Sequence, residues 1–144
     1  MDMREFLEQS LGIELISEAS YHRLAGLALA NGDTDASAFF TEMAEYARLH
    51  RESIQRAAGM DVTPIPSPGS ADTEIPDLRD GRAEAALTAA MEIALAAEMR
   101  GVDFYANIAA RSTDAQIREM ARTFASEEQG HVLALRRFMG LKAY

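Results

Sequence analysis

The chain has 144 residues, of which 48% are apolar and 26% charged, and its formal net charge is −9. A chain of this length is expected to fold as one domain, residues 1–144, with a sizeable core. The negative charge argues against a nucleic-acid partner, because binding to phosphates requires a basic face. The absence of cysteine excludes disulfides, iron–sulfur clusters and any electron-transfer module that holds iron through thiolates.

No targeting or membrane segment is predicted. The first residues lack a basic region followed by an apolar run, so we expect no signal peptide. No segment reaches about 18 uncharged apolar residues, the length that a membrane-spanning helix needs. We therefore expect a cytoplasmic protein without a membrane partner.

Two helices are predicted in the first half of the chain. The first covers residues 3–30, with Leu15 in its apolar stripe, and ends at Asn31-Gly32. Gly12 and Gly26 lie inside it, where we expect small residues to let another helix approach closely. The second helix covers residues 35–58 and ends at Gly59, and either Thr or Asp of Asp33-Thr34-Asp35 is expected to cap its start.

A long connection separates this pair from a second pair of helices. Residues 60–80 contain all four prolines, which predicts an extended, non-helical crossover of about twenty residues. Helices are then predicted over residues 81–111 and 114–139, joined by Ser112 to Asp114. Four long helices with two short loops and one central crossover describe an all-α, ferritin-like four-helix bundle.

Glu128 and His131 are the first candidates for a functional site. Residues three apart on a helix lie on the same face, and the surrounding apolar spacing turns this face inward. A buried carboxylate beside a buried imidazole is costly unless another charge balances it. A divalent metal ion provides this balance, so the pair predicts a metal ligand set.

The two halves of the chain contain glutamate, tyrosine and histidine residues at matching positions. Glu14 precedes Tyr21 by seven residues in the first helix, and Glu98 precedes Tyr105 by seven in the third. A spacing of seven keeps both side chains on one helix face. The next helix of each half brings one histidine, His50 or His131.

This arrangement resembles the rubrerythrin and ferritin-like di-iron proteins, in a short form without a rubredoxin domain. That family's site uses one glutamate from each of two helices and a Glu-x-x-His motif from each of the other two. The resemblance covers nearly the whole chain and implies five metal ligands: Glu14, His50, Glu98, Glu128 and His131. It departs from the family at Ala47, which stands where the bridging glutamate of the first Glu-x-x-His is expected.

The Ala47 departure predicts two unequal half-sites. Three glutamates carry a charge of −3, and two divalent ions carry +4. A bridging hydroxide would balance this difference, so the charge count is compatible with a site for two ions as well as with a site for one. The set Glu98, Glu128 and His131 is complete and suits Fe(II), Mn(II) or Zn(II). The set Glu14, His50 and the shared Glu128 is weaker, so we expect one tight ion and one loose ion.

Four further residues are candidates for supporting roles. Tyr21 and Tyr105 either hydrogen-bond metal-binding glutamates or simply pack in the core. Glu127 either orients a histidine or forms an exposed salt bridge. Glu18, one turn after Glu14, either substitutes for the missing carboxylate or faces solvent. His22 is expected on the surface.

The resemblance implies a non-haem, iron-binding protein that oxidises Fe(II) with peroxide or oxygen, or reduces peroxide, in defence against oxidative stress. Without cysteine, the electrons would come from a separate donor or from Fe(II). The alternatives are a non-catalytic bundle holding one structural or regulatory ion or none, and a plain helical interaction module. The resemblance also implies a homodimer or higher homo-oligomer, with Phe138, Met139 and Tyr144 as candidate contact residues.

Overall fold

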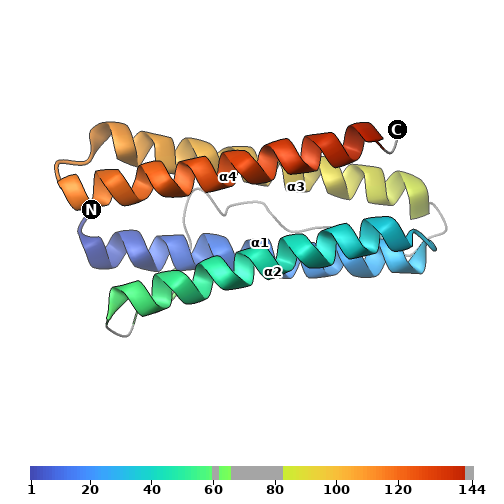
Figure 1. Cartoon of the computed structure of the whole chain (residues 1–144), viewed down its shortest axis with the longest axis horizontal. Coiled ribbons are helices and arrows are strands. Elements are labelled where there is room, and N and C mark those ends of the chain that lie inside the picture. The colour runs from blue at the N-terminus through green and yellow to red at the C-terminus, as the bar shows by residue number, and fades with distance from the viewer. Residues whose placement is uncertain (60–61, 66–82, 142–144) are drawn as a thin grey trace.

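The computed structural model describes residues 1–59, 62–65 and 83–141. It contains four helices and no strand in these ranges: α1 (Met3–Ala30), α2 (Thr34–Ala58), α3 (Ala83–Arg111) and α4 (Ala115–Leu141). All four run along the long axis of the molecule (Figure 1). The predicted ferritin-like bundle, with its long connection between α2 and α3, is confirmed. Most of the predicted crossover, 60–80, and Tyr144 lie outside the described residues.

Aspartates cap the starts of three helices. Asp2, Asp33 and Asp114 accept hydrogen bonds from the first-turn N–H groups of Glu5 (2.8 Å), Ala36 (3.0 Å) and Gln116 (2.8 Å). Each carboxylate satisfies a backbone donor that has no partner within its helix. Local capping chemistry therefore sets these helix starts to within one residue of the prediction.

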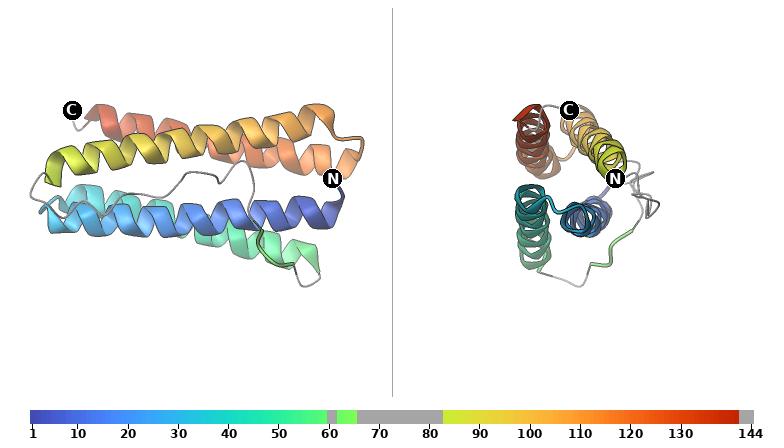
Figure 2. Two further views of the ribbon diagram at one scale, coloured as in Figure 1. Left: turned by 180° about the vertical axis from the view of Figure 1, so that it is seen from behind. Right: turned by 90° about the vertical axis from the view of Figure 1, so that its right-hand side faces the viewer.

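The helices pair as two hairpins, α1 with α2 and α3 with α4. Seen end-on, the four helices occupy the corners of a square, with α4 beside α2 and α3 beside α1 (Figure 2). One apolar cluster fills the end of the bundle around Leu24, Phe40 and Leu135, and a second fills the other end around Phe6, Ile54 and Ile117. In the described part of the chain, no helix is apolar enough over a sufficient length to span a membrane.

The first helix departs from its predicted face at Leu15, whose side chain is 38% exposed. Glu14 takes the inward position beside it and is fully buried. Neighbouring residues on a helix point about 100° apart, so Leu15 does not share the inward direction of Glu14. Placing Leu15 in the apolar stripe was therefore wrong.

The expected reason for the two helical glycines was also wrong. A Cβ added at Gly12 would lie 2.1 Å from the carbonyl oxygen of Ile65, so the glycine admits the connection after α2 rather than another helix. The Ile65 N–H donates to the Glu8 carbonyl oxygen at 3.1 Å, which docks this connection on α1. At Gly26 nothing lies within 4 Å of the added Cβ, so no close approach occurs there.

Candidate metal centre

A polar layer lies between the two apolar clusters, halfway along the bundle. Its buried members are Glu14 on α1, Glu98 on α3 and Glu128 on α4, which are at most 5% exposed. His50 on α2 and His131 on α4 complete it. The structure thus brings together the five residues predicted as ligands.

These residues form two groups that share Glu128. The ligand atoms within the group of Glu14, His50 and Glu128, and within the group of Glu98, Glu128 and His131, all lie within 4.8 Å of one another. Glu128 is therefore placed to bridge two positions. Because Ala47 is 1% exposed and carries no donor atom, α2 contributes only His50.

The first group is organised around the imidazole of His50. Its Nδ1 atom lies 2.7 Å from Oε1 of Glu14, and its Nε2 atom lies 3.0 Å from Oε2 of Glu127. The edge of the ring meets Phe124 at a centroid distance of 4.6 Å and an interplanar angle of 81°. His50 is thus held on three sides, twice by residues of α4.

The second group is more open. The Nδ1 atom of His131 lies 3.5 Å from Oε2 of Glu98 and 3.7 Å from Oε2 of Glu128. It makes no hydrogen bond. The hydroxyl of Tyr21 donates to Oε1 of Glu98 at 2.7 Å, which leaves Oε2 of this carboxylate turned toward the histidine.

The buried glutamates of this layer differ in how strongly they hold a proton. Burial, together with the neighbouring Glu98 and Glu14, raises the pKa of Glu128 well above its usual value. Burial also opposes ionisation of Glu98, but contacts with Glu128 and His131 outweigh it and lower the pKa of Glu98. Of this pair, Glu128 is therefore the carboxyl group that keeps its proton to higher pH, and Glu98 is the one that ionises first.

Both histidines are pushed toward their charged forms. Burial favours a neutral His50, yet its contacts with Glu127 and Glu14 raise its pKa to about 10. Burial likewise opposes the charge on His131, and Glu98 raises its pKa overall. The raised pKa of each imidazole favours uptake of a proton, which adds positive charge to the layer as a metal ion would.

The residues fit a divalent ion. Oε2 of Glu14, Oε2 of Glu98 and Nδ1 of His131 are buried and make no hydrogen bond, although buried polar atoms normally have a partner. Ligand atoms about 2.1 Å from one ion lie about 3–3.5 Å from each other, close to the spacings around His131. Carboxylate and imidazole donors suit iron, manganese and zinc.

The supporting residues have different surroundings. Tyr105 is fully buried and its hydroxyl makes no hydrogen bond, so it is not paired in the way that Tyr21 is. Glu18 faces Arg51, whose Nε lies 3.0 Å from Oε2 of Glu18, and it belongs to neither ligand group in the described residues. His22 is exposed, as expected.

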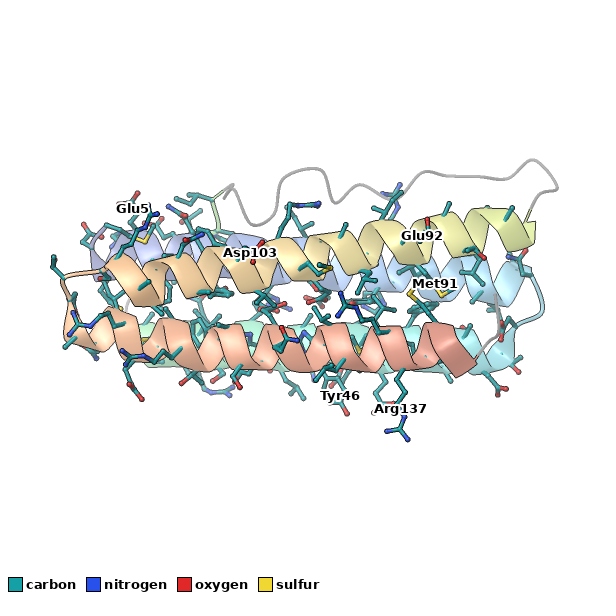
Figure 3. All side chains as sticks on the ribbon, turned by 90° about the horizontal axis from the view of Figure 1, so that it is seen from above. Glu5, Tyr46, Met91, Glu92, Asp103 and Arg137 are labelled. Atoms are coloured by element: carbon teal, nitrogen blue, oxygen red, sulfur yellow. The ribbon has the colours of Figure 1, made fainter. Side chains whose placement is uncertain are left out.

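Sequence reasoning missed two aromatic neighbours of the histidines. Phe124 packs on His50, and the ring of Tyr46 lies 6.5 Å from that of His131 at an angle of 15°. Tyr46 projects at the edge of the bundle formed by α2 and α4 (Figure 3). The available signal was the position of Tyr46, one turn before His50, which matches the place of Glu127 before His131.

The family model for rubrerythrin matches residues 5–139. The chain belongs to the rubrerythrin family. This membership and the buried carboxylate–imidazole cluster support metal binding of the di-iron type. No curated protein matches the chain.

Two solved structures share the fold of this rubrerythrin-family chain. An uncharacterised conserved protein from Magnetospirillum magnetotacticum MS-1 is 27% identical, with a TM-score of 0.82, and the match covers 97% of this chain and 95% of that one. The dodecameric thioferritin of Bacteroides fragilis, described as bacterioferritin-related, is 19% identical, with a TM-score of 0.70 and coverage of 99% and 89%.

Proposed function

We propose that this protein binds iron at Glu14, His50, Glu98, Glu128 and His131 and uses it to oxidise Fe(II) with peroxide or oxygen, or to reduce peroxide. The observation that carries the proposal is the buried cluster of three glutamates and two histidines, several of whose atoms lack partners. Bound iron would supply the redox chemistry. Manganese and zinc suit the same donors.

The two half-sites have unequal sets of ligands. Glu98, Glu128 and His131 form a complete set of two carboxylates and one imidazole, so we assign the tighter ion to it. Glu14 and His50 share Glu128 and lack a carboxylate from position 47, so the ion there is looser. Tyr21 holds Glu98 through its 2.7 Å hydrogen bond to Oε1, which would leave Oε2 of this carboxylate available to an ion.

The proposed centre has one closed side and one more accessible side. Tyr105 and Phe124 close the centre toward one end of the bundle, where both rings are buried. The histidines are the more accessible edge, with side chains 10% and 17% exposed against 1% for Glu14. Since the chain has no cysteine, electrons come from a separate donor or from Fe(II) itself.

The first test is to count metal in purified protein and then measure turnover. We expect about two iron ions per chain under saturating anaerobic Fe(II), and Fe(II) oxidation or peroxide consumption that His131→Ala abolishes. Protein that takes up no metal at saturating Fe(II) would overturn the proposal. We also propose a cytoplasmic homo-oligomer, so the oligomeric state is recorded, and the buffer contains no reductant that would itself consume peroxide or reduce Fe(III).

A second candidate function is favoured by Ala47. A bundle with an incomplete first half-site would bind one structural or regulatory ion without turnover. One tightly bound ion per chain, together with Fe(II) oxidation no faster than in protein-free buffer, would support this alternative over the enzyme.

A further inference from the structure

The two histidines are surrounded by residues at matching positions. Three residues before the histidine (position −3), α2 has Ala47 and α4 has Glu128. Four residues before it (position −4), α2 has Tyr46 and α4 has Glu127. Each residue at −4 reaches across to the histidine of the other hairpin. Glu127 of α4 contacts His50, and Tyr46 of α2 lies against His131.

These matched positions carry different chemistry. His50 has a carboxylate 3.0 Å from its outer nitrogen, whereas His131 has an aromatic ring. The carboxylate thus belongs to the half-site that lacks a glutamate at position 47. The half-site with its full set of glutamates has the uncharged neighbour.

We propose that Glu127 is the positioning residue of the first half-site and restores, from α4, the negative charge that Ala47 does not supply on α2. This inference rests on the proposed metal-binding function. Its geometric basis is that the two nitrogens of His50 face different carboxylates. Nδ1 faces Glu14 inside the ligand group, and Nε2 faces Glu127 outside it.

In this proposal, the contact with Glu127 determines which nitrogen of His50 is available to a metal ion. Nε2 lies 3.0 Å from Glu127 but makes no hydrogen bond in this structure, whereas Nδ1 pairs with Glu14. With an ion bound, the carboxylate at Nε2 would keep a proton on that nitrogen and leave the lone pair of Nδ1 for the ion. Phe124 packs against the ring and restricts its rotation. Because its side chain is 45% exposed, Glu127 can be replaced without opening a cavity in the core.

The test compares metal binding by the wild-type chain and Glu127→Gln. Metal-free protein is titrated anaerobically with Co(II), followed by absorption and calorimetry. We expect the weaker ion to lose about 10–100-fold in affinity, as is usual when the partner of a ligating histidine is removed. The tighter ion at Glu98, Glu128 and His131 should bind as in the wild type.

Two further variants separate positioning from loss of surface charge. Glu119→Gln removes a glutamate on the same helix that is 75% exposed and paired with Arg122, and it should leave both affinities unchanged. Adding Ala47→Glu to Glu127→Gln should return the weaker ion, because the missing charge is then supplied from α2.

A spectroscopic readout is independent of affinity. Long-range ¹H–¹⁵N spectra of the Zn(II)-loaded wild type should show His50 protonated at Nε2, and Glu127→Gln should alter this signal while leaving that of His131 in place. Identical Co(II) isotherms for wild type and Glu127→Gln would overturn the inference and leave the proposed function standing. A wild-type chain that binds no Co(II) or Fe(II) would overturn both.

Discussion

Ala47 is the residue at which this centre differs from a complete set of ligands. It is buried one turn before His50, where a glutamate side chain would point at the same central space. We predict that Ala47→Glu raises the affinity of the weaker ion by about tenfold or more, since it adds a charged donor. The metal content per chain at limiting Fe(II) measures the effect.

The same substitution should weaken the metal-free protein. A fourth carboxylate buried beside Glu14, Glu98 and Glu128 increases repulsion unless an ion or a proton is taken up. Thermal unfolding of Ala47→Glu should therefore occur below that of wild type in chelator and recover with added metal. A variant equally stable in chelator and unchanged in metal content would contradict this account of position 47.

His50 gives the metal-free protein a pH-dependent stability. Its pKa is about 10 in the folded chain, against about 6.5 for an unperturbed histidine. The stabilisation is therefore complete below about pH 6.5, falls through the interval between the two values, and is lost above about pH 10. Urea unfolding in chelator should show a steeper decline over this interval for wild type than for His50→Gln.

At the scale of the helices, Gly12 fixes the route of the chain after α2. A Cβ at this position would meet the Ile65 carbonyl oxygen at 2.1 Å, so Gly12→Ala must displace residues 62–65 from α1. This costs the Ile65–Glu8 hydrogen bond and the burial of Val62. We predict a net loss of about 1–3 kcal/mol in the free energy of unfolding.

Gly26→Ala is the matched control, because it lies in the same helix with nothing within 4 Å of the added Cβ. Alanine is the better helix former by about 1 kcal/mol, so this variant should be at least as stable as wild type. Urea denaturation of both variants measures the difference. Equal stabilities for the two variants would show that the docked connection does not contribute.

The elements show what the sequence could predict and what it could not. Helix starts follow from local signals such as Asp33 and Asp114, and ligand spacing follows from helical periodicity, so both are readable from the chain alone. The contacts of Gly12 with Ile65 and of Glu127 with His50 depend on how distant segments dock. Leu15 was misplaced because an apolar stripe assumes that apolar residues occupy every inward position, whereas Glu14 occupies this one.

At the scale of the whole molecule, the ligands link the two hairpins. Glu14 and His50 belong to the first hairpin, Glu98 and His131 to the second, and Glu128 is shared. In the metal-free chain this layer is held by the Tyr21–Glu98 hydrogen bond and the contact between His50 and Glu14, and several atoms lack partners. An ion bound there would tie the hairpins together in the folded state alone.

Metal binding should therefore stabilise the whole bundle. An ion at 100 times its dissociation constant contributes about 2.7 kcal/mol to the free energy of unfolding. For a chain of this size, that corresponds to a rise in Tm of about 5–10 °C. Calorimetric scans in chelator and in Mn(II) measure the shift, and His131→Ala, which lacks a ligand of the tighter ion, should lose most of it. An unchanged Tm in wild type at saturating Mn(II) would mean that the ion does not join the two hairpins.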